Sequence, residues 1–112
     1  MSEQVVVFIT TGSPQEAERI AEALVAEMLA ACVNILPGVT SIYRWEGEVH
    51  RDDECLLVVK SRQDVLDELV RRVQSLHSYE VPEVIALPLV GGNEAYLSWI
   101  DREVHGNWHA LT

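Results

Sequence analysis

Residues 76–83, Leu-His-Ser-Tyr-Glu-Val-Pro-Glu, contain the side chains best suited to chemistry. They place an imidazole, a phenol and two carboxylates between a helical pattern and an apolar run. Histidine titrates near neutral pH and is the commonest metal ligand in proteins, so His77 is a candidate metal ligand. A histidine at a helix end also interacts favourably with the exposed backbone carbonyls, and this purely structural role for His77 stays open.

The two C-terminal histidines form a second candidate metal site. His105 and His109 are four residues apart, a spacing that places two imidazoles on the same side of a helix. Gly106 and Asn107 lie between them, and both residue types commonly follow the end of a helix. We therefore predict that the helix ends before this pair can hold a metal.

Two weaker candidates remain. His50 lies close to Asp52 and Asp53, a mixed nitrogen and oxygen set that suits loose, solvated cation binding. Cys32 and Cys55 both lie among apolar residues. Because two distant cysteines cannot make a disulfide framework or a zinc site, we expect both to be buried thiols.

Composition limits the class of protein. The chain has 112 residues, enough for one domain, which we expect to span residues 1–112. Its net charge is -10, which repels phosphate backbones and makes nucleic acid an improbable partner. The first residues lack the basic region of a signal peptide, and no apolar run reaches membrane-spanning length. We expect a cytoplasmic protein with no membrane partner.

The elements that must position these residues follow from hydrophobic periodicity. A strand is predicted over residues 5–9, and Ser13, Pro14 and Glu16 then form the start of a helix with a capping box. Extended segments at 33–35 and 39–45 flank a bend at Pro37 and Gly38, and the polar residues 46–54 are predicted to form a hairpin tip. The helix that starts after Ser13 is predicted to end near residue 28. The remaining predictions are a strand over 56–59, a helix over 64–77, a strand over 84–89 and a helix over 93–104.

This order is that of the split βαβ arrangement: an α+β, ferredoxin-like βαββαβ sandwich with an additional C-terminal helix. Helices cover one face of such a sheet, so strands whose other face meets water should alternate apolar and polar residues. The runs at 5–9, 56–59 and 84–87 do not alternate. Because the second face would be a large apolar patch, we predict an obligate homo-oligomer.

Four motifs carry a resemblance to a known family. Residues 30–38 (AACVNILPG), 41–47 (SIYRWEG), 77–83 (HSYEVPE) and 92–100 (GNEAYLSWI) closely resemble the CutA divalent-cation tolerance family. The resemblance extends from about residue 5 to residue 104. It implies a cytoplasmic homotrimer of ferredoxin-like subunits, with sheets packed edge to edge, linked to tolerance of copper and other divalent metals.

The family's copper ligands transfer only in part. In members with known ligands, these are a cysteine at the end of the first strand and consecutive histidines that close the second helix. Ile9 and Leu76 stand at two of these positions, and only His77 keeps a matching residue type. An apolar side chain cannot coordinate a metal, and one imidazole rarely holds a metal alone. The resemblance also implies a pocket at the subunit boundary, near His77 and the residues Cys32, Trp45, Lys60, Tyr79 and Glu80.

Three classes of function follow from these observations. The first is a trimeric, non-enzymatic protein that binds divalent metal, Cu(II) above all, in the response to metal ions. The alternative is a PII-like signalling trimer that binds a small molecule between subunits. An acylphosphatase-like enzyme is disfavoured, because that chemistry needs an arginine in the loop after the first strand and residues 10–14 contain none.

Overall fold

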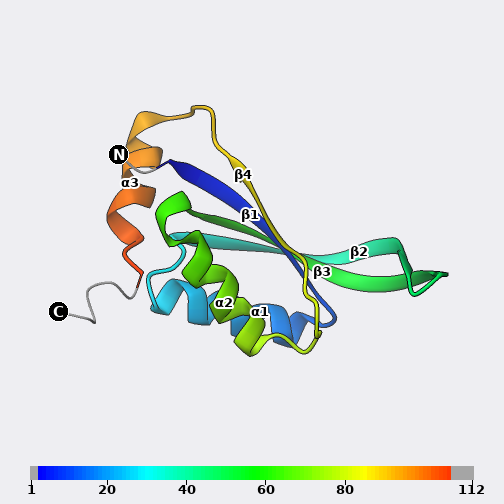
Figure 1. The fold of residues 1–112 in the computed structure, drawn as a ribbon. Coiled ribbons are helices and arrows are strands. Elements are labelled where there is room, and N and C mark those ends of the chain that lie inside the picture. The colour runs from blue at the N-terminus through cyan, green and yellow to red at the C-terminus, as the bar shows by residue number, and fades with distance from the viewer. Residues whose placement is uncertain (1–2, 107–112) are drawn as a thin grey trace.

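A computed structural model of the protein describes residues 3–106. It confirms the predicted α+β class: a four-stranded antiparallel sheet in the order β2-β3-β1-β4, two helices between strands, and a third helix after the last strand (Figure 1). The elements are β1 Gln4–Thr11, α1 Pro14–Ala26, β2 Cys32–Trp45, β3 Glu48–Arg62, the short 3-10 helix η1 Gln63–Val65, α2 Leu66–Leu76, β4 Val84–Pro88 and α3 Glu94–Glu103.

The start of α1 is largely as the sequence predicts. Ser13 caps the helix by accepting a hydrogen bond from the Glu16 N–H at 3.2 Å, and Pro14 occupies the first helical position. The carboxylate of Glu16 does not return to Ser13 to close the capping box. It accepts hydrogen bonds from Ser78 and Gly12 instead. The helix ends at Ala26, two residues earlier than predicted, because Met28 adopts a positive φ of 60°.

The core lies between the sheet and the helices α1 and α2, which cover one of its faces (Figure 1). Side chains alternate along β1, so Val5, Val7 and Ile9 are buried on the helix side while the residues between them are only half-buried. Helix α3 packs near the start of β1 and the end of β3 and adds Ile100 to the same core. The core is therefore built from one face of the sheet alone.

The opposite face of the sheet carries apolar side chains in register. Phe8 on β1 lies between Val58 on β3 and Ile85 on β4, and Val6 lies beside Leu87. Ile85 and Leu87 are each more than half exposed in the single chain. We call these five residues the open face. Its exposure is the physical basis of the oligomer predicted from the sequence.

The β2–β3 hairpin is longer than predicted. The sequence predicts a polar tip over residues 46–54, but the turn is only Glu46 and Gly47, both with positive φ, and β3 already begins at Glu48. The outer part of the hairpin extends past the rest of the sheet as a two-stranded ribbon (Figure 1). The predicted tip was too long because strands were recognised by their apolar residues. A strand with solvent on both sides, such as the start of β3, needs no apolar pattern. The bend predicted at Pro37 and Gly38 is a register shift inside one continuous strand.

No helix among residues 3–106 is long and apolar enough to cross a membrane.

Candidate functional site

The segment singled out by the sequence, 77–83, connects the end of α2 to β4 across one end of the sheet. Its first residue, His77, caps α2: its backbone N–H donates to the carbonyl of Val73 at 2.9 Å, and the chain then turns extended. Glu83, at its other end, approaches Thr10 of β1, whose hydroxyl donates to the carboxylate at 3.5 Å. The segment is thus held against the end of β1.

The ring of His77 is fully buried and both of its nitrogens are used. Nδ1 accepts a hydrogen bond from the backbone N–H of Tyr79 at 3.0 Å, so Nε2 carries the proton and donates to the carbonyl of Thr10 at 2.7 Å. The imidazole therefore joins β1 to the segment after α2. The structural role suggested by the sequence is present, but its partners are a strand carbonyl and the next turn rather than the carbonyls of its own helix.

Glu16 is a second buried anchor of this segment, and sequence reasoning gave it only a capping role. Its carboxylate accepts hydrogen bonds from the N–H of Ser78 at 2.6 Å, the hydroxyl of Ser78 at 3.1 Å and the N–H of Gly12 at 3.4 Å. Burial alone would raise the pKa of Glu16, but the hydrogen bonds that its carboxylate accepts from Ser78 and Gly12 lower that pKa below its ordinary value of 4.5. Glu16 is a charged clamp between α1 and the segment.

These contacts do not fit a metal site within one chain. His77 could bind a cation only by giving up one of its two hydrogen bonds, and residues 3–106 contain no group of three His, Cys, Asp or Glu side chains placed to hold a metal. Ile9, at the family's cysteine position, is fully buried in the core, and Leu76 packs against that core. The side chain of residue 9 therefore does not face solvent.

The other predicted histidine sites are placed as follows. Helix α3 ends at Glu103, so His105 lies beyond it, and its backbone N–H donates to the carbonyl of Met28. His109 lies outside the described residues. His50, on β3, stacks on Tyr43 across the hairpin with ring centroids 5.4 Å apart.

Tyr79 is positioned by a carboxylate. Its hydroxyl donates to Glu54 of β3 at 2.8 Å, and its ring packs over Gly12, where even a Cβ atom would lie 3.1 Å from the hydroxyl. Burial and the hydrogen bond to Glu54 raise the pKa of Tyr79 far above its ordinary value of 10.0, so the phenol is neutral. Tyr43 donates a hydrogen bond to Asp52 in the same way.

These residues line a groove where the ribbon meets the segment after α2. It consists of two adjoining hollows, of about 360 and 540 Å³, which share Tyr43, Trp45, Tyr79 and Val81. We call it the aromatic groove. Carboxylates complete it: Glu54 and Glu83 line the first hollow, and Glu46 and Glu80 line the second.

The pocket residues implied by family resemblance divide into two groups within one chain. Trp45, Tyr79 and Glu80 meet in the aromatic groove. Cys32 and Lys60 pair with one another at the other end of the β2–β3 hairpin, with the ammonium 3.9 Å from the thiol sulfur. The resemblance places the pocket at a boundary between subunits, so only a second chain could bring the two groups together. Cys55 is a buried free thiol as predicted, whereas Cys32 is half-buried.

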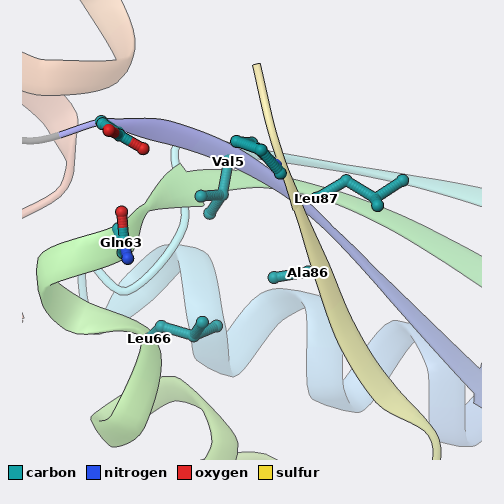
Figure 2. Close-up of a pocket in the computed structure, with 7 residues that line it drawn as sticks. Val5, Gln63, Leu66, Ala86 and Leu87 are labelled. Atoms are coloured by element: carbon teal, nitrogen blue, oxygen red, sulfur yellow. The ribbon is translucent and has the colours of Figure 1, made fainter. Parts of the chain in front are cut away.

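A separate, smaller pocket of about 170 Å³ lies between β4 and the start of α2 (Figure 2). Val5 and Ala86 line it from the sheet, and Gln63 and Leu66 line it from the segment after β3. Most of its lining is apolar, and none of the candidate metal-ligand or pocket residues named from the sequence lines it.

Comparison with known proteins assigns the chain to a family. Residues 5–103 match the family described as "CutA1 divalent ion tolerance protein". The chain belongs to this family. It is 56% identical over 95 residues to the divalent-cation tolerance protein CutA of Thermus thermophilus, and the aligned residues cover 85% of this chain and 92% of that protein. It is 48% identical over 96 residues to "Protein CutA, chloroplastic" of Arabidopsis thaliana, covering 86% of this chain but only 53% of that protein.

The structural comparison agrees. The solved structure of the divalent cation tolerance protein of Thermus thermophilus superposes with a TM-score of 0.90 at 52% identity, over 91% of this chain and 99% of that one. The family resemblance recognised in the motifs is therefore confirmed, and with it a link to divalent-cation tolerance in general.

Proposed function

We propose that this CutA family protein is a homotrimer that binds divalent metal ions, copper above all, in the cellular response to those ions, and that it catalyses no reaction. Membership of the divalent ion tolerance family is the observation that carries the metal part of the proposal. The open face carries the assembly part, because the half-exposed Phe8, Val58 and Ile85 form a continuous apolar surface that water would meet in a monomer. We expect the protein to act in the cytoplasm, which cell fractionation would test.

A trimer also reconciles metal binding with the geometry of the single chain. Residues 3–106 of one chain do not assemble three metal ligands, and both nitrogens of His77 are engaged. A site shared between chains would add ligands from a neighbour to groups such as His77. Metal binding should then depend on assembly.

The assembly is tested by light scattering, which should give three times the 12.6 kDa mass of one chain. Val58→Asp would place a charge on the open face and should abolish the trimer or leave insoluble protein. Val90→Asp is the matched control, because Val90 is fully exposed in the loop after β4 and its substitution should leave the mass unchanged. A folded monomer of the parent protein would refute the trimer.

The metal part is tested by calorimetry with Cu(II) and Zn(II). Cu(II) should bind more tightly, as the usual affinity order for nitrogen and oxygen ligands requires, and binding should weaken on acidification because protons compete for the same lone pairs. His77→Ala should remove most of the specific binding, whereas His105→Ala should matter little. Equal copper affinity in the parent and in His77→Ala would exclude His77 as a ligand.

A second candidate function is supported by the aromatic groove. A PII-like trimer that binds a small molecule would need a concave site lined by aromatic and polar side chains, and this groove has that character.

A further inference from the structure

We propose that residues 104–106, which we call the C-terminal strap, form a lock on part of the pocket implied by the family resemblance. In place, the strap holds the start of β2, which carries Cys32 opposite Lys60. When the strap is released, this part of the pocket loosens while the sheet stays folded. The inference deepens the second candidate function and rests on it for the meaning of the pocket.

The strap leads from α3 to the end of α1. Helix α3 ends at Glu103, and the next residue, Val104, is fully buried in the core. The backbone N–H groups of His105 and Gly106 then both donate to the carbonyl of Met28, at 2.9 and 3.1 Å. A carbonyl oxygen has two lone pairs, so it can accept both hydrogen bonds at once. The end of α3 therefore lies beside the turn that follows α1 (Figure 1).

Gly106 fits its position closely. Its φ is 67°, a conformation that glycine adopts readily and that residues with a side chain disfavour. A Cβ atom at this position would lie 2.8 Å from Oε1 of Glu68 and 3.1 Å from Cγ1 of Val65. Both neighbours belong to the segment that starts α2. The strap is thus wedged between the turn after α1 and the start of α2.

The turn that receives the strap has an unfavourable backbone conformation. Met28 has a φ of 60°, which is uncommon for a residue with a side chain. Because its carbonyl accepts both hydrogen bonds from the strap, the strap fixes the peptide group that joins Met28 to Leu29. Without the strap, this carbonyl would lose both donors. The strap therefore stabilises a turn that local backbone preference does not favour.

The same turn determines where β2 begins. The carbonyl of Leu29 accepts a hydrogen bond from the hydroxyl of Ser61 at 2.7 Å, and the N–H of Ala31 donates to the carbonyl of Lys60 at 2.9 Å. Cys32 then lies directly opposite Lys60, whose ammonium is 3.9 Å from the thiol sulfur. The position of the Cys32–Lys60 pair thus depends on a turn that the strap holds.

Helix α3 also reaches this pair directly, because the phenol of Tyr96 interacts with the thiol of Cys32. Beyond Cys32, β2 is held by β3 instead: Val33 pairs with Val59, and the pairing continues along the hairpin. Local opening follows the contacts that hold each segment. Release of the strap should therefore affect the first residues of β2 rather than the whole sheet.

The lock is tested by amide hydrogen exchange, followed residue by residue by NMR. The amides of residues 29–31 are suitable probes because each donates a backbone hydrogen bond. Gly106→Ala should speed their exchange by roughly tenfold, because a side chain disfavours positive φ by about the free energy that changes an equilibrium constant tenfold. Exchange on β1, at residues 5–9, should change far less. The Cβ resonance of Cys32 should also move, which would show that the change reaches the pocket.

Gly47→Ala is the matched control for Gly106→Ala. Gly47 has a similar φ of 82°, but a Cβ atom there would meet nothing within 4 Å, and the residue lies in the turn of the ribbon. This substitution imposes the same kind of backbone strain at a distance from the strap. It should leave the exchange of residues 29–31 and the resonance of Cys32 unchanged.

A second pair of variants decides the question if Gly106→Ala does not fold. Val104 and Val73 are both fully buried valines of the same core, but only Val104 belongs to the strap. Val104→Ala should speed exchange at residues 29–31 and move the Cys32 resonance, and Val73→Ala should do so much less. Light scattering on each variant shows whether its assembly matches that of the parent.

Unchanged exchange at residues 29–31 in the folded strap variants, or acceleration that is equally large on β1, would overturn the lock. Faster exchange at residues 29–31 with an unmoved Cys32 resonance would also overturn it, because the pocket would then not respond to the strap. These measurements need no ligand. A failure of metal or small-molecule binding would therefore refute the proposed function and leave the result on the lock unchanged.

Discussion

Replacing Glu16 by Gln tests whether the buried carboxylate clamps the segment after α2. The substitution keeps the shape of the side chain but removes the charge and turns one acceptor oxygen into a donor. That donor would face the N–H or hydroxyl donors of Ser78, or the N–H of Gly12, which lie 2.6–3.4 Å from the carboxylate. At least one of these donors then loses its partner.

The cost follows from the number and kind of hydrogen bonds that the substitution removes. Hydrogen bonds to a charged group contribute about 1.5–3 kcal/mol each, and a buried donor left unsatisfied costs about 1–3 kcal/mol. Since the amide keeps one acceptor oxygen, some of this free energy is retained. We expect Glu16→Gln to lower the free energy of unfolding by about 2 kcal/mol at neutral pH.

The pH dependence provides the sharper measurement. Hydrogen bonds from Ser78 and Gly12 outweigh burial and hold the pKa of Glu16 below its ordinary value of 4.5. On acidification the carboxylate of residue 16 is therefore protonated in the unfolded chain before it is protonated in the folded protein. The stabilisation by Glu16 is complete above the ordinary pKa of 4.5 and is lost as pH falls through the lower pKa of the folded state. The difference in stability between parent and variant should shrink over this acidic range.

Guanidinium unfolding at a series of pH values, at one fixed chain concentration, would measure this difference, because the stability of an oligomer depends on concentration. Glu18→Gln, on the exposed side of the same helix, is the control and should change stability by less than about 0.5 kcal/mol. A difference between parent and Glu16→Gln that stays constant across the acidic range would refute the clamp.

Three other predictions test individual side chains. Ser13→Ala removes the cap of α1 and should cost about 1 kcal/mol in urea unfolding. His77→Ala leaves a strand carbonyl and a turn N–H without partners and should cost about 2–5 kcal/mol in thermal or denaturant unfolding, whereas a near-parent stability would show that water replaces the ring. The hydrogen bond from Tyr43 to Asp52, and burial of Tyr79 and Tyr96, raise the pKa of all three tyrosines above 10.0. Tyrosinate absorbance should therefore appear at higher pH in the folded protein than in the unfolded chain. The stability that the neutral phenols add is complete below pH 10.0 and is lost as pH rises from 10.0 through the higher pKa values of the folded state.

Most of the fold could be predicted from local sequence patterns. The start of α1 was predicted in detail because a cap depends on residues within one turn, such as Ser13 and Pro14. The open face was predicted because apolar runs on β1 and β3 are visible without any knowledge of their partners. The β2 half of the ribbon was predicted as the extended segment 39–45, but its β3 half was missed because the mostly charged residues 46–54 have the composition of a loop.

The site was less accessible to sequence reasoning, because its contacts join residues far apart in the chain. His77 was recognised as important, but its bonds to Thr10 and Tyr79 depend on the packing of α2 against the end of β1. The clamp from Glu16 to Ser78 spans 62 residues, and no local signal marks it. Family resemblance named Trp45, Tyr79 and Glu80 as pocket residues, and these three line the aromatic groove of the single chain, but no local pattern marked the groove itself.

The ribbon formed by the outer part of β2 and β3 has a consequence for local stability. A two-stranded hairpin is only marginally stable in water by itself, and this one presents Ile42 and Val49 to solvent, 64% and 65% exposed in the single chain. Its backbone amides should therefore exchange with solvent deuterium much faster than those of β1 whenever the ribbon lacks a neighbour. Slow exchange of the amides of residues 42–49 in the native protein would show that another chain packs on the ribbon. Hydrogen exchange at this one element thus reports whether the protein is assembled, before any change in the core can be detected.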